Sequence, residues 1–321
     1  MKVGIGLPTT IPGVQRDQVL DWSRCADAAG FSTLGTLDRL IYPNWEPLVA
    51  LGTAAAVTER IGLMTAVLLL PYRQNAAVVA KQAATVHTIS GGRLTLGVGL
   101  GSRDEDYDAS DVPTKDRGRR MNQMLAEIRR LWEGEEVGYA GGIGPDVRDR
   151  PPEIIVGGMS DQALRRAAQY GDGWMLGGGS PGRFQEQSEK LLAAWRKRGR
   201  DGEPRKLALT YFALGDDPEG DTKRSIGDYY SFAPDYAEAI VAVTAKGEDA
   251  VRERVDQFRE AGVDEVVMFP ASADPAQVDL LARVASDRSS GASTGRCPGR
   301  SDALPSTPRG TMTGGCALQS W

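Results

Sequence analysis

The chain has 321 residues, of which 41% are hydrophobic and 25% are charged, and its formal net charge is −5. This composition is typical of a soluble globular protein with a large core, and the negative charge predicts no nucleic-acid partner. No apolar run reaches the roughly 18 residues of a membrane-spanning helix, and one histidine with three scattered cysteines predicts no metal site.

The first part of the chain alternates strand patterns with helix patterns. Residues 1–8 alternate Val, Ile and Leu with glycine, which indicates a core strand and not a signal peptide, so we expect a cytoplasmic protein. Further strand patterns occupy residues 31–37, 61–70 and 94–99. Helix patterns with one apolar face occupy residues 15–30, 45–58, 75–90 and 117–132.

The alternation continues after a polar, glycine-rich surface excursion at residues 133–150. Strand patterns follow at residues 153–156, 172–176, 207–214 and 263–270. Helix patterns occupy residues 160–170, 184–198, 236–244 and 250–262. Residues 216–232 form an irregular insertion between the seventh strand and its helix.

Eight strands that alternate with helices over residues 1–285 predict an α/β fold, a (β/α)8 TIM barrel with insertions. A TIM barrel usually takes about 250 residues, which leaves room for two insertions. The alternative is a doubly wound open sheet, because the same alternation suits both architectures.

The composition changes after about residue 285. Residues 286–321 lack Lys, Glu, Val, Ile, Phe and Tyr, and Ser, Thr, Gly and Pro make up 20 of these 36 residues. Such a segment buries too little apolar surface to fold alone, so we expect a disordered tail.

Several motifs in fixed order carry a family resemblance. They include Asp38 after the second strand, an Ile-Ser-Gly-Gly-Arg ending at Arg93, Gly97-Val98-Gly99-x-Gly101, and Ile155-x-Gly157-Gly158-x-Ser160. Each motif is weak alone, but their collective order resembles the bacterial luciferase-like flavin-dependent oxidoreductases. That resemblance covers roughly residues 1–285, and it implies a (β/α)8 barrel that uses either reduced FMN with O2 or a deazaflavin coenzyme.

The resemblance implies a flavin across the carboxyl-terminal mouth of the barrel, with its phosphate at Gly157, Gly158 and Ser160. Two glycines and a serine at the start of a helix also present free N–H groups and a positive dipole end to an anion. The alternative for this segment is an ordinary capped turn without a ligand.

The flavin ring has its own candidate residues. Gly97 and Gly99 end the fourth strand and are expected to form a floor under the ring. Relatives often have a cis peptide at the end of the third strand that supports the ring, and Thr65 and Ala66 are the nearest positions with Val67.

Catalytic candidates follow the second and fourth strands. Many relatives have Asp-His where this chain has Asp38-Arg39, so a histidine is missing there. Three roles stay open for Arg39: an ion pair with Asp38, a contact to an oxygen of substrate or flavin, or plain exposure to water. Tyr107 and Arg103 lie in the acidic loop after strand four, as substrate contacts or as part of a solvated face.

Other aromatic residues are expected to shape the substrate pocket. Trp45 and Tyr72 follow the second and third strands, and they either wall an apolar cavity or only cover the barrel end. The insertion with Tyr229, Tyr230 and Phe232 is placed to act as a lid that excludes water.

These expectations combine into a cytoplasmic, homodimeric, two-component monooxygenase. A separate flavin reductase supplies reduced FMN, and O2 then oxygenates a small organic substrate, as the resemblance implies. The alternatives are a deazaflavin-dependent oxidoreductase and a non-catalytic flavin-binding relative. Leu100 stands where deazaflavin sugar-phosphate dehydrogenases tend to have a carboxylate, which argues against a sugar-phosphate substrate.

Overall fold

The computed structural model of the chain describes residues 1–285. The expected tail at residues 286–321 lies outside the described residues. No helix in the described part is both long and apolar enough to cross a membrane. Within the same residues, no group of three His, Cys, Asp or Glu side chains is placed to hold a metal ion.

Eight parallel strands form a closed barrel, which confirms the predicted (β/α)8 fold. Each strand pairs with its neighbour in the order β10-β1-β2-β3-β5-β6-β7-β8, and β8 pairs with β10 from Glu265–Leu207 to Pro270–Phe212. This last pairing closes the ring and excludes an open sheet. The strands are β1 (Lys2–Gly6), β2 (Thr33–Thr36), β3 (Gly62–Thr65), β5 (Leu94–Gly99), β6 (Glu153–Gly157), β7 (Gly173–Gly177), β8 (Arg205–Ala213) and β10 (Glu265–Pro270).

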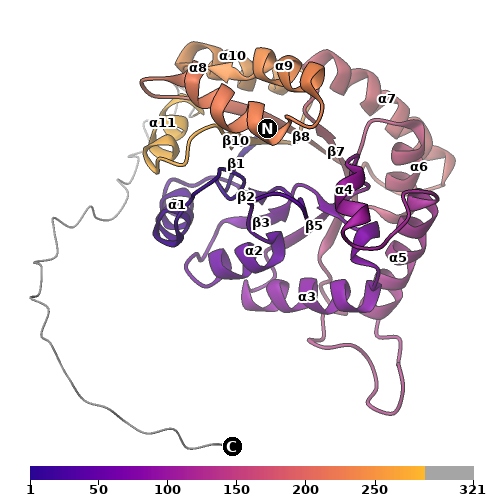
Figure 1. The fold of residues 1–321 in the computed structure, drawn as a ribbon. Coiled ribbons are helices and arrows are strands. Elements are labelled where there is room, and N and C mark those ends of the chain that lie inside the picture. Colours follow the sequence, from indigo (N-terminus) through magenta and orange to yellow (C-terminus); the bar gives the residue numbers. More distant parts are fainter. Residues whose placement is uncertain (286–321) are drawn as a thin grey trace, which may run out of the picture.

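Helices surround the barrel (Figure 1). In the helix after β5, Met121, Leu125 and Ile128 are buried, and each such side chain contributes about 1.5–3 kcal/mol of stability. The alternation predicted a helix after the eighth strand without giving its bounds, and α11 lies at that place. The outer helices are α1 (Arg16–Ala28), α2 (Pro47–Ala55), α3 (Ala76–Ile89), α5 (Arg117–Trp132), α6 (Asp161–Tyr170), α7 (Pro181–Lys197), α10 (Glu248–Glu260) and α11 (Ala276–Ala285).

The third predicted strand is shorter than expected. Residues 61–70 were expected to form one strand, but β3 ends at Thr65 and pairing resumes only in the two-residue β4 (Leu68–Leu69). The peptide bond between Ala66 and Val67 is cis, in agreement with the position that the family resemblance implied. A short 3-10 helix η1 (Pro71–Arg73) follows.

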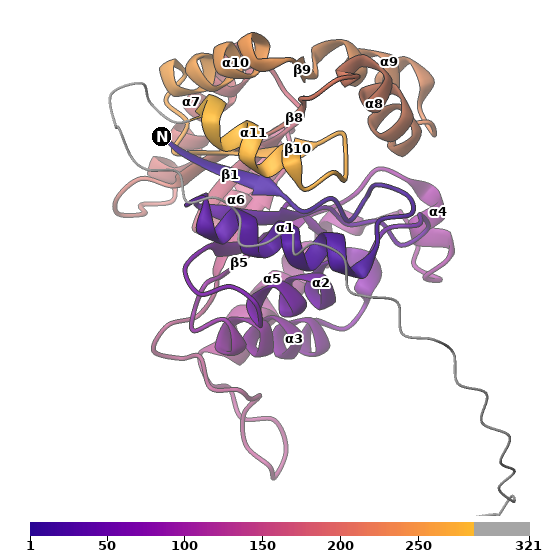
Figure 2. The same cartoon turned by 90° about the vertical axis from the view of Figure 1, so that its left-hand side faces the viewer.

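Two segments that were expected to be irregular are helical. The acidic loop after β5 forms α4 (Asp104–Asp108). The insertion after β8 contains α8 (Pro218–Asp221) and the π-helical turn η2 (Thr222–Gly227), before α9 (Pro234–Val243) and the short strand β9 (Ala245–Lys246). In contrast, the stretch between α5 and β6 projects from the barrel as expected, with Tyr139 fully exposed (Figure 2).

The barrel interior and the insertion share one apolar cluster. Met64, Ile155 and Val267 are buried inside the barrel, and the same cluster reaches Ile226 and Tyr229 of the insertion. Figure 2 shows α4, α8 and α9 at one end of the barrel, the end toward which the strands run. The insertion therefore covers part of the carboxyl-terminal mouth, as the predicted lid requires.

Candidate functional site

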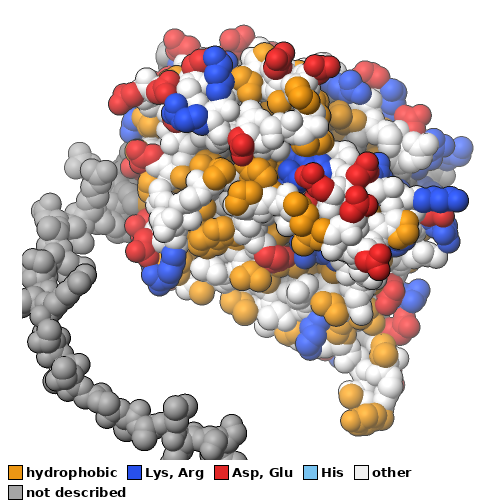
Figure 3. All heavy atoms as spheres, viewed as in Figure 1, with side chains coloured by type: hydrophobic (Ala, Val, Ile, Leu, Met, Phe, Trp, Pro, Cys, Tyr) orange, Lys and Arg blue, Asp and Glu red, His pale blue; other side chains and the backbone are white. Residues whose placement is uncertain are grey.

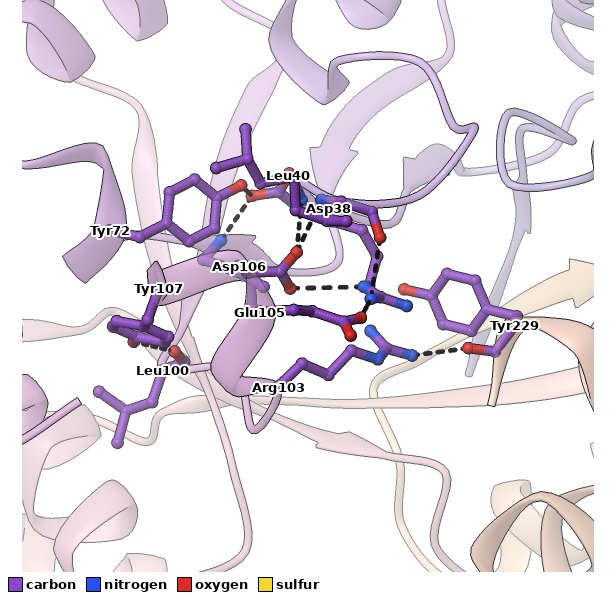
Figure 4. A network of polar contacts seen from close by, with 12 residues as sticks. Asp38, Leu40, Tyr72, Leu100, Arg103, Glu105, Asp106, Tyr107 and Tyr229 are labelled. Atoms are coloured by element: carbon purple, nitrogen blue, oxygen red, sulfur yellow. Dashed lines mark hydrogen bonds and ion pairs between the residues drawn. The ribbon is translucent and has the colours of Figure 1, made fainter. Parts of the chain in front are cut away.

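The loops that follow β2, β3 and β5 meet at the barrel mouth, because parallel strands end on the same side of a barrel. Figure 1 looks onto this mouth, and Figure 4 shows the polar side chains that it brings together. The site is therefore assembled from segments that lie between about residue 38 and residue 230 in the sequence.

Asp38 is the buried centre of one hydrogen-bond network. Its carboxylate accepts the Leu69 N–H at 2.8 Å and the Tyr72 hydroxyl at 2.9 Å. It also pairs with Arg73 at 3.0 Å, and Arg73 in turn pairs with Glu46 at 2.9 Å. Burial raises the pKa of the Asp38 carboxyl, while the neighbouring guanidinium acts in the opposite direction. The network fixes the end of β2 to the segment after β3.

Arg39 is buried and does not pair with Asp38. Two of its three expected roles, exposure to water and an ion pair with Asp38, are therefore wrong. It is 6% exposed and forms ion pairs with Glu105 and with Asp106, the latter at 3.3 Å. Burial and, second, repulsion from Arg103 lower the pKa of the Arg39 guanidinium. The remaining role, a contact to a substrate or flavin oxygen, stays a prediction.

Asp106 is a residue of the site that the sequence did not single out. Its side chain is fully buried and accepts the N–H groups of Leu40 at 3.0 Å and Ile41 at 2.8 Å. Its neighbours Asp104 and Glu105 are exposed. The acidic residues from position 104 to position 108 look alike in sequence, so nothing in their own pattern distinguishes Asp106. Only the adjacent aromatic residue Tyr107 indicates which side of α4 faces inward.

Tyr107 is that aromatic residue, and it is fully buried. Its hydroxyl donates a hydrogen bond to the Leu100 carbonyl, and its ring meets Tyr72 edge-on with the centroids 6.3 Å apart. Burial raises the pKa of Tyr107 to about 12. This placement makes Tyr107 a support of the loop after β5, and its expected contact with substrate stays a prediction.

Arg103 reaches from the start of α4 toward the insertion (Figure 4). It is 8% exposed and donates a hydrogen bond of 2.9 Å to the Tyr229 carbonyl. Its guanidinium carbon lies 4.6 Å from the centroid of the Tyr229 ring and 4.1 Å from that of Phe232. Arg103 therefore connects the loop after β5 with the insertion over the mouth.

The space beside the glycines of β5 and β6 is occupied by other residues of the barrel. A β-carbon on Gly97 would collide with the Thr65 carbonyl, and one on Gly99 would lie 2.5 Å from the Val67 side chain. A β-carbon on Gly157 would lie 2.9 Å from the same Val67. Thr65 and Val67 fill the space beside Gly97 and Gly99, and the expected contact of these two glycines with a flavin ring stays a prediction. Ala66 is buried in the barrel-interior cluster, and Val67 packs against it.

The predicted phosphate site begins α6. The Ser160 hydroxyl accepts the Ala163 N–H at 3.2 Å, so this hydroxyl caps the helix as the alternative expectation had it. The remaining N–H groups of the first turn have no partner within the helix, and the dipole adds positive potential there. Gly158 has φ +130°, and its carbonyl accepts the Trp174 indole N–H at 2.6 Å.

A basic groove of about 630 Å³ opens beside this helix start, between α5 and α6. Leu100 and Ser160 line its edge toward the barrel mouth, and Asp116 is the one acidic residue in its lining. The arginines that line it are Arg117, Arg119, Arg165, Arg166 and Arg198. Arg166 is 6% exposed and is held by Asn122 and the Gly118 carbonyl, both neutral groups. The groove is therefore suited to an anion, and a phosphate at the start of α6 would lie beside it.

The predicted wall residues differ in their surroundings. Tyr72 is 5% exposed, and its hydroxyl is engaged with Asp38, so it lies beneath the mouth. Trp45 is half-buried and packs against the core between the barrel and its outer helices. Their contacts with a substrate stay a prediction.

Comparison with known proteins shows that one protein family covers almost all of the described residues. The profile of the luciferase-like monooxygenase family matches residues 1–269. An uncharacterized protein of Mycobacterium tuberculosis is 32% identical over 200 residues, which cover 53% of this chain and 67% of that protein. The F420-dependent glucose-6-phosphate dehydrogenase of Beutenbergia cavernae is 31% identical over 80% of this chain and 75% of its own length.

A solved structure agrees with the barrel architecture. The monooxygenase RslO1 from Streptomyces bottropensis superimposes with a TM-score of 0.72. The superposition covers 88% of this chain and 98% of that chain at 22% sequence identity. At this identity the likeness concerns the fold.

Proposed function

The chain belongs to the luciferase-like monooxygenase family of oxidoreductases, and from this premise we propose that it is a flavin-dependent monooxygenase that takes reduced FMN and O2. The proposed substrate is a small organic molecule. A separate flavin reductase supplies the reduced FMN transiently, and the protein works as a cytoplasmic homodimer by analogy with such enzymes.

The single observation that supports a phosphorylated flavin-type cofactor in this proposal is the candidate anion site at the barrel mouth. The start of α6 provides N–H groups and a dipole, and the adjacent groove provides five arginines against one carboxylate. Both lie next to Leu100 at the end of β5, where a TIM barrel usually binds its ligand. A cofactor with one phosphate and a flat apolar ring fits a charged groove beside an apolar barrel opening.

Residues of the chain have defined roles in the proposed reaction. Gly158 and Ser160 bind the phosphate through the chain at the start of α6, and Val67, supported from below by Gly99 and Gly157, orients the ring. Tyr229 and the rest of the insertion exclude water from the mouth. The reduced flavin, when bound, supplies the electrons that let O2 transfer one oxygen atom to the substrate and the other to water.

A deazaflavin-dependent oxidoreductase is the second candidate. The relative from Beutenbergia cavernae is named for its F420 dependence, and it covers four-fifths of this chain. Its sugar-phosphate substrate does not follow for this chain, because Leu100 replaces the carboxylate expected for that activity. The same phosphate site serves both cofactors, so the geometry of α6 favours neither.

Anaerobic titration of the purified protein with reduced FMN and with the reduced deazaflavin, each followed by addition of O2, tests the proposal. Binding of reduced FMN and substrate-dependent consumption of O2 would support the monooxygenase. Turnover with the deazaflavin alone would select the second candidate. Binding of FMN without substrate-dependent O2 consumption would identify a non-catalytic flavin-binding relative.

A further inference from the structure

Three arginines lie at the barrel mouth, and their ion pairs differ. Arg73 pairs with Asp38 and Glu46, and Arg39 pairs with Glu105 and Asp106. Arg103 has no ion pair with any carboxylate in the described part of the chain. Arg103 is therefore a buried cation without a direct ion-pair partner among the described residues, whereas the other two arginines each pair with two carboxylates.

The contacts of Arg103 compensate only part of this charge. One guanidinium nitrogen donates to the Tyr229 carbonyl at 2.9 Å, and the Nε–H has no acceptor within the described residues. The faces of Tyr229, Tyr230 and Phe232 surround the guanidinium at 4.1–5.7 Å. A ring face attracts a cation but contributes only about 0.5–2 kcal/mol, well below the cost of burying a charge without a counter-ion.

An arginine cannot avoid this cost by losing its charge, because the guanidinium stays protonated in proteins. The neighbouring Arg39 is itself paired with Glu105 and Asp106, and after burial the repulsion from Arg103 is the next cause of the lowered pKa of Arg39. A bound anion would supply the counter-charge that Arg103 lacks. It would also offset the repulsion between Arg103 and Arg39. The geometry of the guanidinium fork further favours a planar group with two oxygens.

The residues around Arg103 also indicate the chemistry of the rest of a ligand whose anionic group binds there. Tyr42 and Tyr229 meet edge-on with their centroids 5.2 Å apart, and Phe232 is 41% exposed at the edge of the cluster. In Figure 3, which views the same face as Figure 1, basic and acidic side chains meet near the middle of the mouth beside hydrophobic ones. A ligand at this position meets a positive charge and aromatic walls together.

We propose that Arg103 binds a carboxylate of the substrate, so that the substrate is an organic acid whose charged group is attached to an apolar body. This inference rests on the proposed function in placing the substrate at the mouth. It goes beyond that function in assigning the charge of the substrate and the residue that selects it.

Binding of matched pairs of ligands to the full-length protein without flavin tests the proposal. Calorimetric titration at constant ionic strength compares benzoate with benzamide, phenylacetate with phenylacetamide, and hexanoate with hexanamide. We expect at least one carboxylate to bind about tenfold or more tightly than its amide, the preference typical of a charge-assisted hydrogen bond. Equal binding within every pair, or no binding of any carboxylate, would overturn the proposal.

Three variants locate the preference. Arg103→Gln should reduce it to about twofold or less, whereas Arg103→Lys should retain part of it because the charge remains. Arg24→Gln, a change of an exposed arginine of α1, is the matched control and should retain it fully. Circular dichroism and thermal unfolding show whether each variant is folded. A preference that survives in folded Arg103→Gln would also overturn the proposal.

The two proposals fail separately in these experiments. A protein that binds reduced FMN but shows no carboxylate preference retains the proposed function and loses this inference. A protein that prefers carboxylates through Arg103 but binds no flavin retains this inference and loses the proposed function.

Discussion

Thr65 and Gly97 contact each other through two groups on neighbouring segments of the barrel. The Thr65 hydroxyl donates a hydrogen bond of 2.6 Å to the Gly97 carbonyl, and the Thr65 carbonyl occupies the place that a β-carbon on Gly97 would need. The glycine at position 97 is thus explained by close packing of protein against protein. A ligand above β5 would contact Val67, which lies over the next glycine of the strand.

Gly97→Ala should therefore destabilise the barrel strongly. The new β-carbon meets backbone that cannot move without disturbing β3, so we expect a loss of about 2–4 kcal/mol in the free energy of unfolding. Gly177→Ala, at the end of β7, is the matched control, because a β-carbon there meets nothing within 4 Å. Urea unfolding of both variants checks this, and equal stability of the two would contradict the packing explanation.

The basic groove should bind the cofactor phosphate. Replacing two of its arginines, in the double variant Arg117→Gln with Arg165→Gln, should weaken FMN binding about tenfold or more, because each charge-assisted hydrogen bond to phosphate is worth about 1.5–3 kcal/mol. Riboflavin, which lacks the phosphate, should bind the variant as it binds the wild type. Arg196→Gln on α7 is the control outside the groove. Fluorescence quenching of the flavin measures all of these affinities, and an equal loss for both flavins would refute the assignment.

Breaking the Asp38 network should destabilise the mouth. Asp38→Asn leaves Arg73 with Glu46 as its remaining carboxylate and removes the charge that accepts the Leu69 N–H. Loss of one partner from a buried ion pair costs about 3–5 kcal/mol, and we expect an effect near the lower end because Glu46 remains. Thermal unfolding compares it with Asp21→Asn, which changes an exposed pair on α1. A loss no larger than that of the control would contradict the network's role.

The only histidine of the chain should produce a distinct pH dependence of stability. His87 is 5% exposed, with its two ring nitrogens near the carbonyls of Leu94 and Arg150, and burial lowers its pKa from 6.5. Above pH 6.5 both the folded and the unfolded protein hold a neutral ring, so stability is unaffected. Below pH 6.5 the unfolded protein binds the proton first, so stability falls until the pH passes the lowered folded pKa.

Comparison of the wild type with His87→Gln isolates this effect, since Asp38 and the other acids are present in both proteins. Urea unfolding at a series of pH values should show a stability slope below pH 6.5 in the wild type that the variant lacks. Parallel pH profiles for the two proteins would show that the histidine does not titrate differently on folding.

The sequence predicted the barrel because its signals are local. Strand patterns such as Leu94, Leu96 and Val98, and helix patterns such as Met121 to Trp132, depend on burial of one face within a few residues. The break of the third strand at Ala66 was not visible in this way, since residues 61–70 are apolar apart from Gly62 and Thr65 and have no turn signal. The segment packs against Gly97 and Gly99, some 30 residues later, and such a distant contact leaves no local signal.

The polar contacts of the site were harder to predict. Asp38 and Arg39 are adjacent in sequence but pair with different partners, Arg73 and the α4 acids, because consecutive side chains after a strand point in different directions. Which acid of a charged run is buried depends on how α4 docks, and sequence spacing alone does not contain that information. The arginines of the groove come from two helices, α5 and α6, and from Arg198 directly after α7, and only the fold assembles them.

The proposed function requires that a flavin binds at the barrel mouth with its phosphate at the start of α6. The most direct test is the ratio of the affinities of the wild-type protein for FMN and for riboflavin, measured in the same buffer by flavin fluorescence. We expect FMN to bind about tenfold or more tightly than riboflavin, because only FMN has a phosphate for the helix start and the arginines. Equal affinities, or binding of neither flavin, would contradict it.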